Sequence, residues 1–184
     1  FEHFLPDTKS LPPFGIVNRF DQTSDGTIWA ATQAGLLELD PSSSRLSLHQ
    51  HQEDNPRSLF SNDLTSVLAD TNDRVWVISR DNGISVIDTD HGFALRFEHS
   101  ASDFSSLSSN IIYDAFEDDE GEIWIGTHEG LDLFVPSENH FRRFTRQNTG
   151  LPSDVISSIY QTREGKYWIG TYFGLASGMP TIFT

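Results

Sequence analysis

The sequence predicts an all-β protein, a β-propeller segment of four four-stranded antiparallel blades that forms part of a larger propeller. Four repeats are visible, and they are centred on Trp29, Trp76, Trp124 and Trp168, which are all the tryptophans of the chain. Short segments alternate apolar and polar residues, which is typical of half-buried strands. No segment carries a helical period over ten or more residues. These observations assign residues 1–184 to one propeller segment.

The repeats share residue types at fixed offsets from their tryptophans, which lie 47, 48 and 44 residues apart. Each has an aliphatic residue twelve positions before the tryptophan (Val17, Leu64, Ile112, Ile156) and an apolar residue nine before it (Phe20, Val67, Ala115, Ile159). A small hydroxyl residue follows by three positions (Thr32, Ser79, Thr127, Thr171) and a glycine by six or seven (Gly35, Gly83, Gly130, Gly174). We interpret these as packing positions, with each tryptophan buried between neighbouring blades.

Each repeat is expected to form four strands in order. A first strand, such as 111–117, leads through a Gly or Asp turn into the tryptophan strand, a hairpin signature. An alternating third strand follows in the first three repeats, at 36–40, 84–88 and 131–134. The outer strand comes after a Pro- or Ser-rich turn, at 46–49, 95–98 and 141–144. Polar loops such as 52–62 and 100–110 then lead to the next repeat.

The two ends of the chain resemble outer strands. Residues 1–4 match the pattern of 141–144, and residues 182–184 match the start of such a strand. Because the chain begins with Phe1, we expect a piece of a longer protein. Residues 1–4 pair with the fourth blade if the ring closes at four blades. In an open arc, unpaired strand edges favour self-association.

The composition excludes several partners. The chain has 27 acidic and 12 basic residues, a formal net charge of −15, which disfavours nucleic acid and anionic membrane surfaces. It has no cysteine, so disulfides and thiolate metal sites are excluded. No apolar run is long enough for direct membrane insertion.

No catalytic residue, metal site or cofactor is predicted. The chain lacks a Gly-x-Ser-x-Gly nucleophile motif, and no pair among its many carboxylates is singled out. His49 and His51 place two imidazoles on one strand face, but no third ligand is identifiable. The acidic turn 118–122 lacks the ligand spacing of a calcium loop, and we interpret it as a solvated turn.

Ligand binding is the favoured role of the residues that vary between repeats. If the first strand lines the central channel, two sets of loops meet on one face. The candidate ligand-binding residues are Arg80, Asp81, Asn82, His128, Glu129, Tyr172 and Phe173, after the tryptophan strands, and Asn62 and Asn110, before the first strands. Arginine, histidine and aromatic side chains suit a carbohydrate or other small polar ligand. The alternative is that these are ordinary solvated loop residues.

The third and fourth repeats resemble a known family. The segment 151–171, with Leu151-Pro152-Ser153 and Glu164-Gly165-Lys166-Tyr167-Trp168-Ile169-Gly170-Thr171, resembles the two-component regulator propeller repeat, as does 109–127. The first repeat departs from the pattern at Ala30-Ala31 and the second at Asn72-Asp73-Arg74.

The resemblance implies a role without chemistry in this segment. Such repeats form the extracytoplasmic, periplasmic sensor region of bacterial receptors whose output is a histidine kinase, a hybrid regulator or a diguanylate cyclase. A ligand would act by shifting the dimer arrangement of the parent receptor. Two alternatives stay open: a propeller enzyme of the streptogramin-lyase or glycan-active type, and purely structural blades for assembly.

Overall fold

The computed structural model describes residues 14–88 and 93–178. The described part consists of strands and one four-residue helix, α1 (Arg146–Thr149), so the all-β prediction is confirmed. None of its helices has the length and hydropathy of a membrane span. The chain forms two compact units, Phe1–Ser79 with Ser85–Arg96, and Arg80–Ile84 with Phe97–Thr184.

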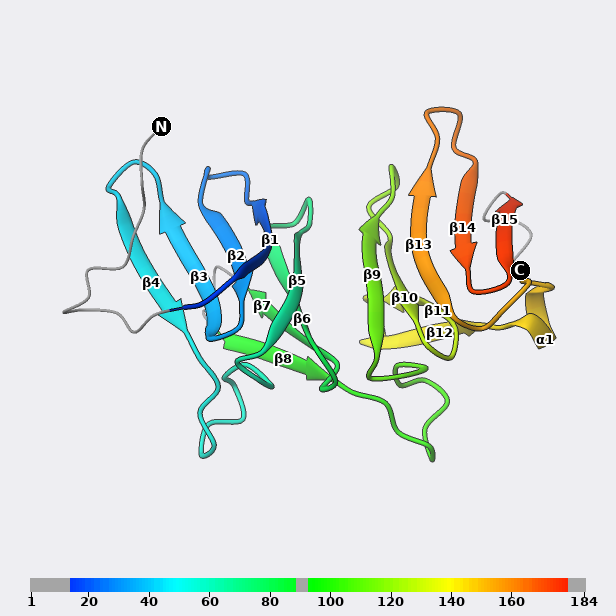
Figure 1. Cartoon of the computed structure of the whole chain (residues 1–184), viewed down its shortest axis with the longest axis horizontal. Coiled ribbons are helices and arrows are strands. Elements are labelled where there is room, and N and C mark those ends of the chain that lie inside the picture. The colour runs from blue at the N-terminus through cyan, green and yellow to red at the C-terminus, as the bar shows by residue number, and fades with distance from the viewer. Residues whose placement is uncertain (1–13, 89–92, 179–184) are drawn as a thin grey trace. The chain divides into compact units, whose positions relative to one another are not determined.

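The first unit contains two four-stranded antiparallel sheets, called blades one and two, whose strands follow one another in chain order (Figure 1). Blade one consists of β1 (Val17–Gln22), β2 (Ile28–Thr32), β3 (Gly35–Asp40) and β4 (Arg45–His49). Blade two consists of β5 (Leu64–Ala69), β6 (Arg74–Ser79), β7 (Ile84–Asp88) and β8 (Phe93–Phe97). The predicted strands 36–40 and 84–88 are therefore confirmed to within one residue.

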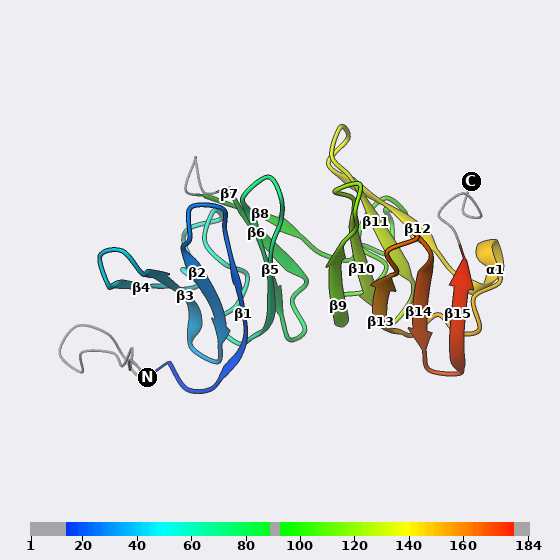
Figure 2. The same cartoon turned by 90° about the horizontal axis from the view of Figure 1, so that it is seen from above.

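The second unit contains blades three and four, again with strands in chain order (Figure 2). Blade three consists of β9 (Ile112–Glu117), β10 (Ile123–Thr127), β11 (Leu131–Val135) and β12 (His140–Phe144). Blade four consists of β13 (Ile156–Gln161), β14 (Tyr167–Thr171) and β15 (Gly174–Gly178). The outer strands predicted at 1–4 and 182–184 lie outside the described residues.

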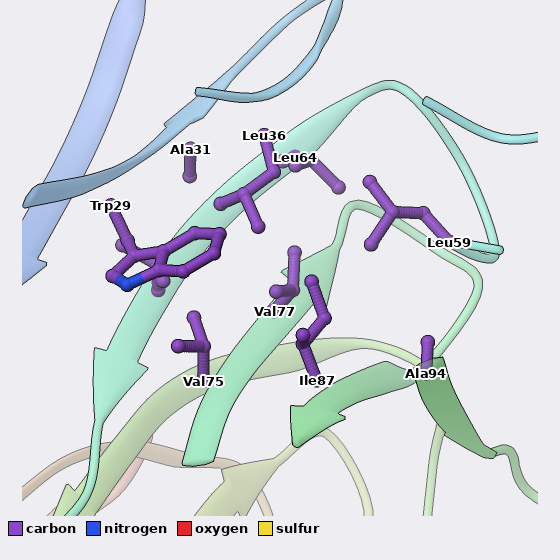
Figure 3. Close-up of a cluster of buried hydrophobic side chains, with 10 residues drawn as sticks. Trp29, Ala31, Leu36, Leu59, Leu64, Val75, Val77, Ile87 and Ala94 are labelled. Atoms are coloured by element: carbon purple, nitrogen blue, oxygen red, sulfur yellow. The ribbon is translucent and has the colours of Figure 1, made fainter. Parts of the chain in front are cut away.

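The tryptophan of blade one is buried against blade two, as predicted. Trp29 is 5% exposed and shares a core cluster with Leu64, Val75 and Val77 of β5 and β6. Figure 3 shows the Trp29 indole among these aliphatic side chains. The burial of a large aromatic ring against a neighbouring sheet makes this contact a major source of stability for the unit.

Trp124 has the same role in the second unit. It packs with Ile156, Ile159 and Tyr167 of blade four in one buried cluster. The ring centroids of Trp124 and Tyr167 are 5.6 Å apart. Because two independent blade pairs bury the tryptophan in the same way, the interpretation of this position as a packing position is confirmed for both.

Three large side chains predicted at packing positions are exposed instead. Trp168 is 36% exposed, and the Nζ of Lys166 lies 4.8 Å from its ring centroid. Val17 and Phe20 on β1 are also exposed. The cover of Trp29 and Trp124 comes from the blade that follows each of them, and no described sheet follows blade four.

The recurring hydroxyl and glycine form the corner between the second and third strands. Thr32 Oγ1 donates to the carbonyl of Gly35 at 2.6 Å, and Thr127 Oγ1 donates to that of Gly130 at 2.9 Å. Gly35 has a φ of +130°, and a Cβ there would collide with the carbonyl oxygen of His49. Only glycine fits this position without strain, which explains its recurrence.

Candidate functional site

The corner residues predicted to bind ligand are exposed in blades two, three and four, where they connect the second and third strands. The backbone amide of His128 donates to the carbonyl of Ile111 at 3.0 Å, and that of Tyr172 donates to the carbonyl of Val155 at 3.1 Å. The same bond therefore fixes the corner in blades three and four. A rigid corner backbone that carries different side chains is a suitable scaffold for recognition.

In blade three, the structure places His128 beside a tyrosine that the sequence did not single out. The Nδ1 of His128 lies 3.1 Å from the hydroxyl of Tyr113, which is an exposed residue of β9. The neighbouring Glu129 uses its backbone amide to bond the Thr127 hydroxyl at 3.0 Å. The sequence could have identified Tyr113 by its place next to Ile112 in the predicted strand, because successive side chains point to opposite faces.

In blade four, Tyr172 and Phe173 form an exposed aromatic pair. Their ring centroids are 5.0 Å apart at an interplanar angle of 79°, and the two residues are 73% and 71% exposed. This edge-to-face arrangement holds two apolar surfaces at the corner. The pair lies within blade four, and the His128–Tyr113 pair lies within blade three. The remaining corner residues, Arg80, Asp81 and Asn82, are exposed between β6 and β7.

Asn62 and Asn110 have a recurring structural role. The side-chain oxygen of Asn62 accepts from the backbone amide of His51 at 2.6 Å, and that of Asn110 accepts from His99 at 2.6 Å. Asp154 accepts from Arg146 in the same way at 2.7 Å. All three stand fourteen positions before a tryptophan, so this shared offset could have identified them as residues that fix a loop. The hydrogen bonds that their side-chain oxygens accept hold the loop that follows the outer strand.

The two histidines considered for a metal site have separate partners. His49 Nε2 lies 2.6 Å from Glu38 Oε2, whereas His51 Nδ1 lies 2.7 Å from the carbonyl oxygen of Leu59. Within residues 14–88 and 93–178, no three or more acidic or histidine side chains are grouped as metal ligands.

The acidic turn of blade three is not fully solvated, which corrects the sequence interpretation. Asp118 is buried, and its carboxylate accepts from Trp124 Nε1 at 2.7 Å and from the Tyr167 hydroxyl at 2.5 Å. Burial and the neighbouring Asp118 and Glu120 raise the pKa of Glu122. Asp118 is therefore an internal acceptor that links blades three and four, because Tyr167 belongs to the next blade.

A second buried carboxylate lies in the core of blade three. Asp132 Oδ2 accepts from the backbone amide of Ser108 at 2.7 Å and from its hydroxyl at 2.8 Å. Burial raises the pKa of Asp132 from 3.8 to about 6. Among the described residues, Asp132 Oδ1 has no hydrogen-bond partner. The contacts of Asp132 are internal ones that secure the loop before β9.

Two segments of the chain match the family described as two component regulator propeller, residues 106–129 and 150–173. No curated protein matches the chain. The two segments are the third and fourth repeats, which carried the resemblance in the sequence.

The chain is also similar in structure to larger propellers. The extracellular domain of a hybrid two component system from B. thetaiotaomicron matches with a TM-score of 0.81 and 19% identity, over 96% of this chain and 25% of that one. Virginiamycin B lyase from Staphylococcus aureus matches with a TM-score of 0.62 and 14% identity, over 91% of this chain and 57% of that one. The chain thus spans a quarter of the length of the first structure. At such identities the likeness shows the fold alone.

The predicted resemblance is therefore confirmed by the family match and the fold together. The chain is a β-propeller segment, and its residues 106–129 and 150–173 match the two component regulator propeller family.

Proposed function

We propose that this chain is a periplasmic sensor segment of a bacterial signal-transduction receptor, with no chemistry of its own. The observation that carries the proposal is that both segments matching the two component regulator propeller family end at exposed corners. The first ends at His128 and Glu129, and the second ends at Tyr172 and Phe173. The two matching repeats thus carry different side chains at the same corner position, where the same backbone hydrogen bond holds the chain.

Binding suits these corners better than catalysis. The aromatic pair offers surfaces for stacking, and the His128–Tyr113 pair offers hydrogen-bonding groups, the combination expected in sites for polar ligands. The buried carboxylates Asp118 and Asp132 are engaged by core partners instead. We therefore propose a carbohydrate or another small polar ligand for the corners.

The proposed output is a change in the arrangement of a receptor dimer. A ligand shifts such an equilibrium only if it binds one arrangement more tightly than the other. The fold likeness to virginiamycin B lyase, at 14% identity, supplies no argument for an enzyme. Assembly without a ligand is the remaining alternative, and the experiment separates it from sensing.

The test uses the whole extracytoplasmic region of the parent receptor in a thermal-shift screen with mono- and oligosaccharides. A ligand present at about 100 times its Kd should stabilise the protein by about 2.7 kcal/mol. The stabilisation should be lost in His128→Ala and in the double variant Tyr172→Ala/Phe173→Ala. Tyr160→Ala, which changes an exposed tyrosine of β13 outside the corner, is the control and should retain it.

Two results would contradict the proposal. One is the absence of a thermal shift with every ligand class, which favours assembly. The other is conversion of a ligand to product by the purified region, which favours an enzyme.

A further inference from the structure

The first unit contains a cavity of about 480 Å³ beside Trp29. It is bounded on one side by blade one and on the other by the loop 52–62 and blade two. Its polar lining includes Asp25, Glu38, His49 and Arg57. The volume lies within the range of small-molecule sites, about 300–1,000 Å³.

Comparison with blade three explains why the cavity is polar. The rings of Trp29 and His49 have centroids 5.7 Å apart at 36°, and those of Trp124 and Phe144 are 5.7 Å apart at 37°. The strand registers agree, since His49 faces Leu36 as Phe144 faces Leu131. His49 therefore takes the place of a buried phenylalanine.

Two further replacements favour an open space. Glu38 stands at the position of Leu133, which packs against the core of the second unit. Val75, which shares the buried cluster of Trp29, stands where the second unit has Tyr167, one position before the next tryptophan. The second unit fills this region with a leucine and two large rings, whereas the first unit has smaller or polar side chains.

The polar pair is accessible from solvent. Glu38 Oε2 and His49 Nε2 are 2.6 Å apart, and their side chains are 34% and 42% exposed. Since the same register accommodates Leu133 and Phe144 in blade three, folding of the blade does not require an acid and a histidine here. Ligand binding would account for the acid and the histidine at these two positions.

Charges of opposite sign lie on opposite walls of the cavity. Blade one supplies the carboxylates of Glu38 and Asp25. Asp25 accepts from the backbone amide of Thr27 at 2.9 Å and from the hydroxyl of Thr23 at 2.8 Å, bonds that lower its pKa and keep it ionised. The loop 52–62 supplies the cationic residue Arg57.

The loop that carries Arg57 is held in place from blade two. Arg96 Nε donates to the carbonyl of Ser58 at 2.8 Å, and its Nη2 donates to the carbonyl of Leu59 at 2.9 Å. The carbonyl of Arg57 itself accepts from the backbone amide of Ala94 at 3.0 Å. A wall fixed before binding reduces the entropic cost of association.

We propose that this cavity binds a small zwitterion of the amino-acid class. Its ammonium group lies at Glu38 and Asp25, its carboxylate at Arg57, and its aliphatic part against Leu48 and Ile87. A simple anion is disfavoured by the two carboxylates, and a simple cation is disfavoured by the guanidinium. The site belongs to the first unit, so it stands apart from the corners of blades three and four that carry the proposed sensor function.

The test is calorimetric titration of the intact protein with L-leucine as the probe. Isopentylamine lacks the carboxylate, and 4-methylpentanoate lacks the ammonium group. L-leucine should bind, and each of the other two should bind at least about tenfold more weakly. Glu38→Gln and Arg57→Gln should each weaken L-leucine binding by about tenfold or more, because each removes one charged contact.

A double variant provides a control for folding. Glu38→Leu/His49→Phe installs the pair found in blade three, so it should fold with an unchanged circular dichroism spectrum and still lose L-leucine binding. Glu138→Gln alters another Glu–His pair, in which Glu138 lies 3.2 Å from His140 in blade three, and should bind as the wild type does.

Three results would overturn the inference. They are no heat of binding with L-leucine at millimolar concentration, binding of isopentylamine or 4-methylpentanoate as tight as that of L-leucine, and undiminished L-leucine binding by the folded double variant. None of these depends on His128, Tyr172 or Phe173, so they leave the proposed sensor function to its own test.

Discussion

Glu38 and His49 are within hydrogen-bond distance of each other across β3 and β4, with 2.6 Å between Oε2 and Nε2, at two positions that hold Leu133 and Phe144 in blade three. One strand register therefore accommodates a polar pair in one blade and an apolar pair in another. In a repeat protein, such an exchange separates what a blade needs to fold from what one particular blade carries.

We expect a double-mutant cycle at Glu38 and His49 to show coupling. Glu38→Leu and His49→Phe alone should each lower the free energy of unfolding by about 0.5–1 kcal/mol, because each leaves the other polar group without its partner. The double variant should be at least as stable as the wild type, since a packed apolar pair replaces the polar one. Urea unfolding followed by circular dichroism measures this. A double variant less stable than both single variants would contradict it.

Tyr167→Phe should lower the free energy of unfolding by about 1.5–3 kcal/mol, the range for a hydrogen bond to a charged group. The Tyr167 hydroxyl donates to Asp118 at 2.5 Å, and burial followed by this bond raises the pKa of Tyr167, which keeps the hydroxyl protonated. Tyr160→Phe on the neighbouring strand, where the ring is exposed, should change stability by less than about 0.5 kcal/mol. Equal effects of the two changes would show that the bond to Asp118 is not stabilising.

Asp132 should make stability depend on pH. Burial, opposed by the bonds from Ser108 and by the charges of Arg143 and His99, raises its pKa from 3.8 to about 6. Between these values the folded state binds the proton more strongly than the unfolded state does. Its contribution to the free energy of unfolding is therefore full below about pH 4 and falls as the pH rises to about 6.

Asp132→Asn removes this dependence. Relative to the wild type, the variant should gain about 1–3 kcal/mol of stability between pH 4 and pH 7, the size that follows from a shift of one to two pKa units. Urea unfolding at both pH values gives the comparison. The same difference between variant and wild type at both values would show that Asp132 does not titrate in this range.

Gly35→Ala should destabilise the protein more than Gly174→Ala. Both glycines have positive φ, +130° and +137°, so both substitutions strain the backbone. At Gly35 the new Cβ would also meet the carbonyl oxygen of His49, whereas no described atom lies within 4 Å of it at Gly174. We expect a difference of at least about 2 kcal/mol in thermal unfolding, because the clash involves backbone that side-chain rotation cannot relieve. A similar loss of stability in both variants would mean that backbone strain at positive φ, and not the clash with His49, determines the effect.

Asn110→Ala should lower the free energy of unfolding by about 1 kcal/mol, since the backbone amide of His99 loses its acceptor at 2.6 Å. Asn82→Ala, an exposed corner residue of the same type, is the control and should have little effect on stability. Thermal unfolding of the two variants measures the difference. Loss of ligand response in Asn110→Ala with unchanged stability would instead favour a binding role for Asn110.

Much of the fold could be predicted because its determinants are local. The alternation along β3 and β7, and the Gly or Asp turns before the tryptophan strands, depend on residues close together in the chain. The hydrogen bond that closes the corner, from Thr127 to Gly130, likewise joins residues within one four-residue segment. The exposure of His128, which lies between them, could be predicted from this corner. These positions recur at fixed offsets, so four copies of one pattern in a single sequence were sufficient to identify them.

The sequence by itself determined four tryptophan-centred blades, their strand order and the corners that vary between them. Only the tertiary structure decided which side chains meet across neighbouring blades. Tyr167 reaches Asp118 over 49 residues, and the cavity beside Trp29 is lined by Glu38 and His49 of blade one together with Ile87 and Ala94 of blade two. Such contacts depend on side-chain volume and on which sheet packs on which. No offset within one repeat contains that information, because burial and cavities are properties of two packed surfaces.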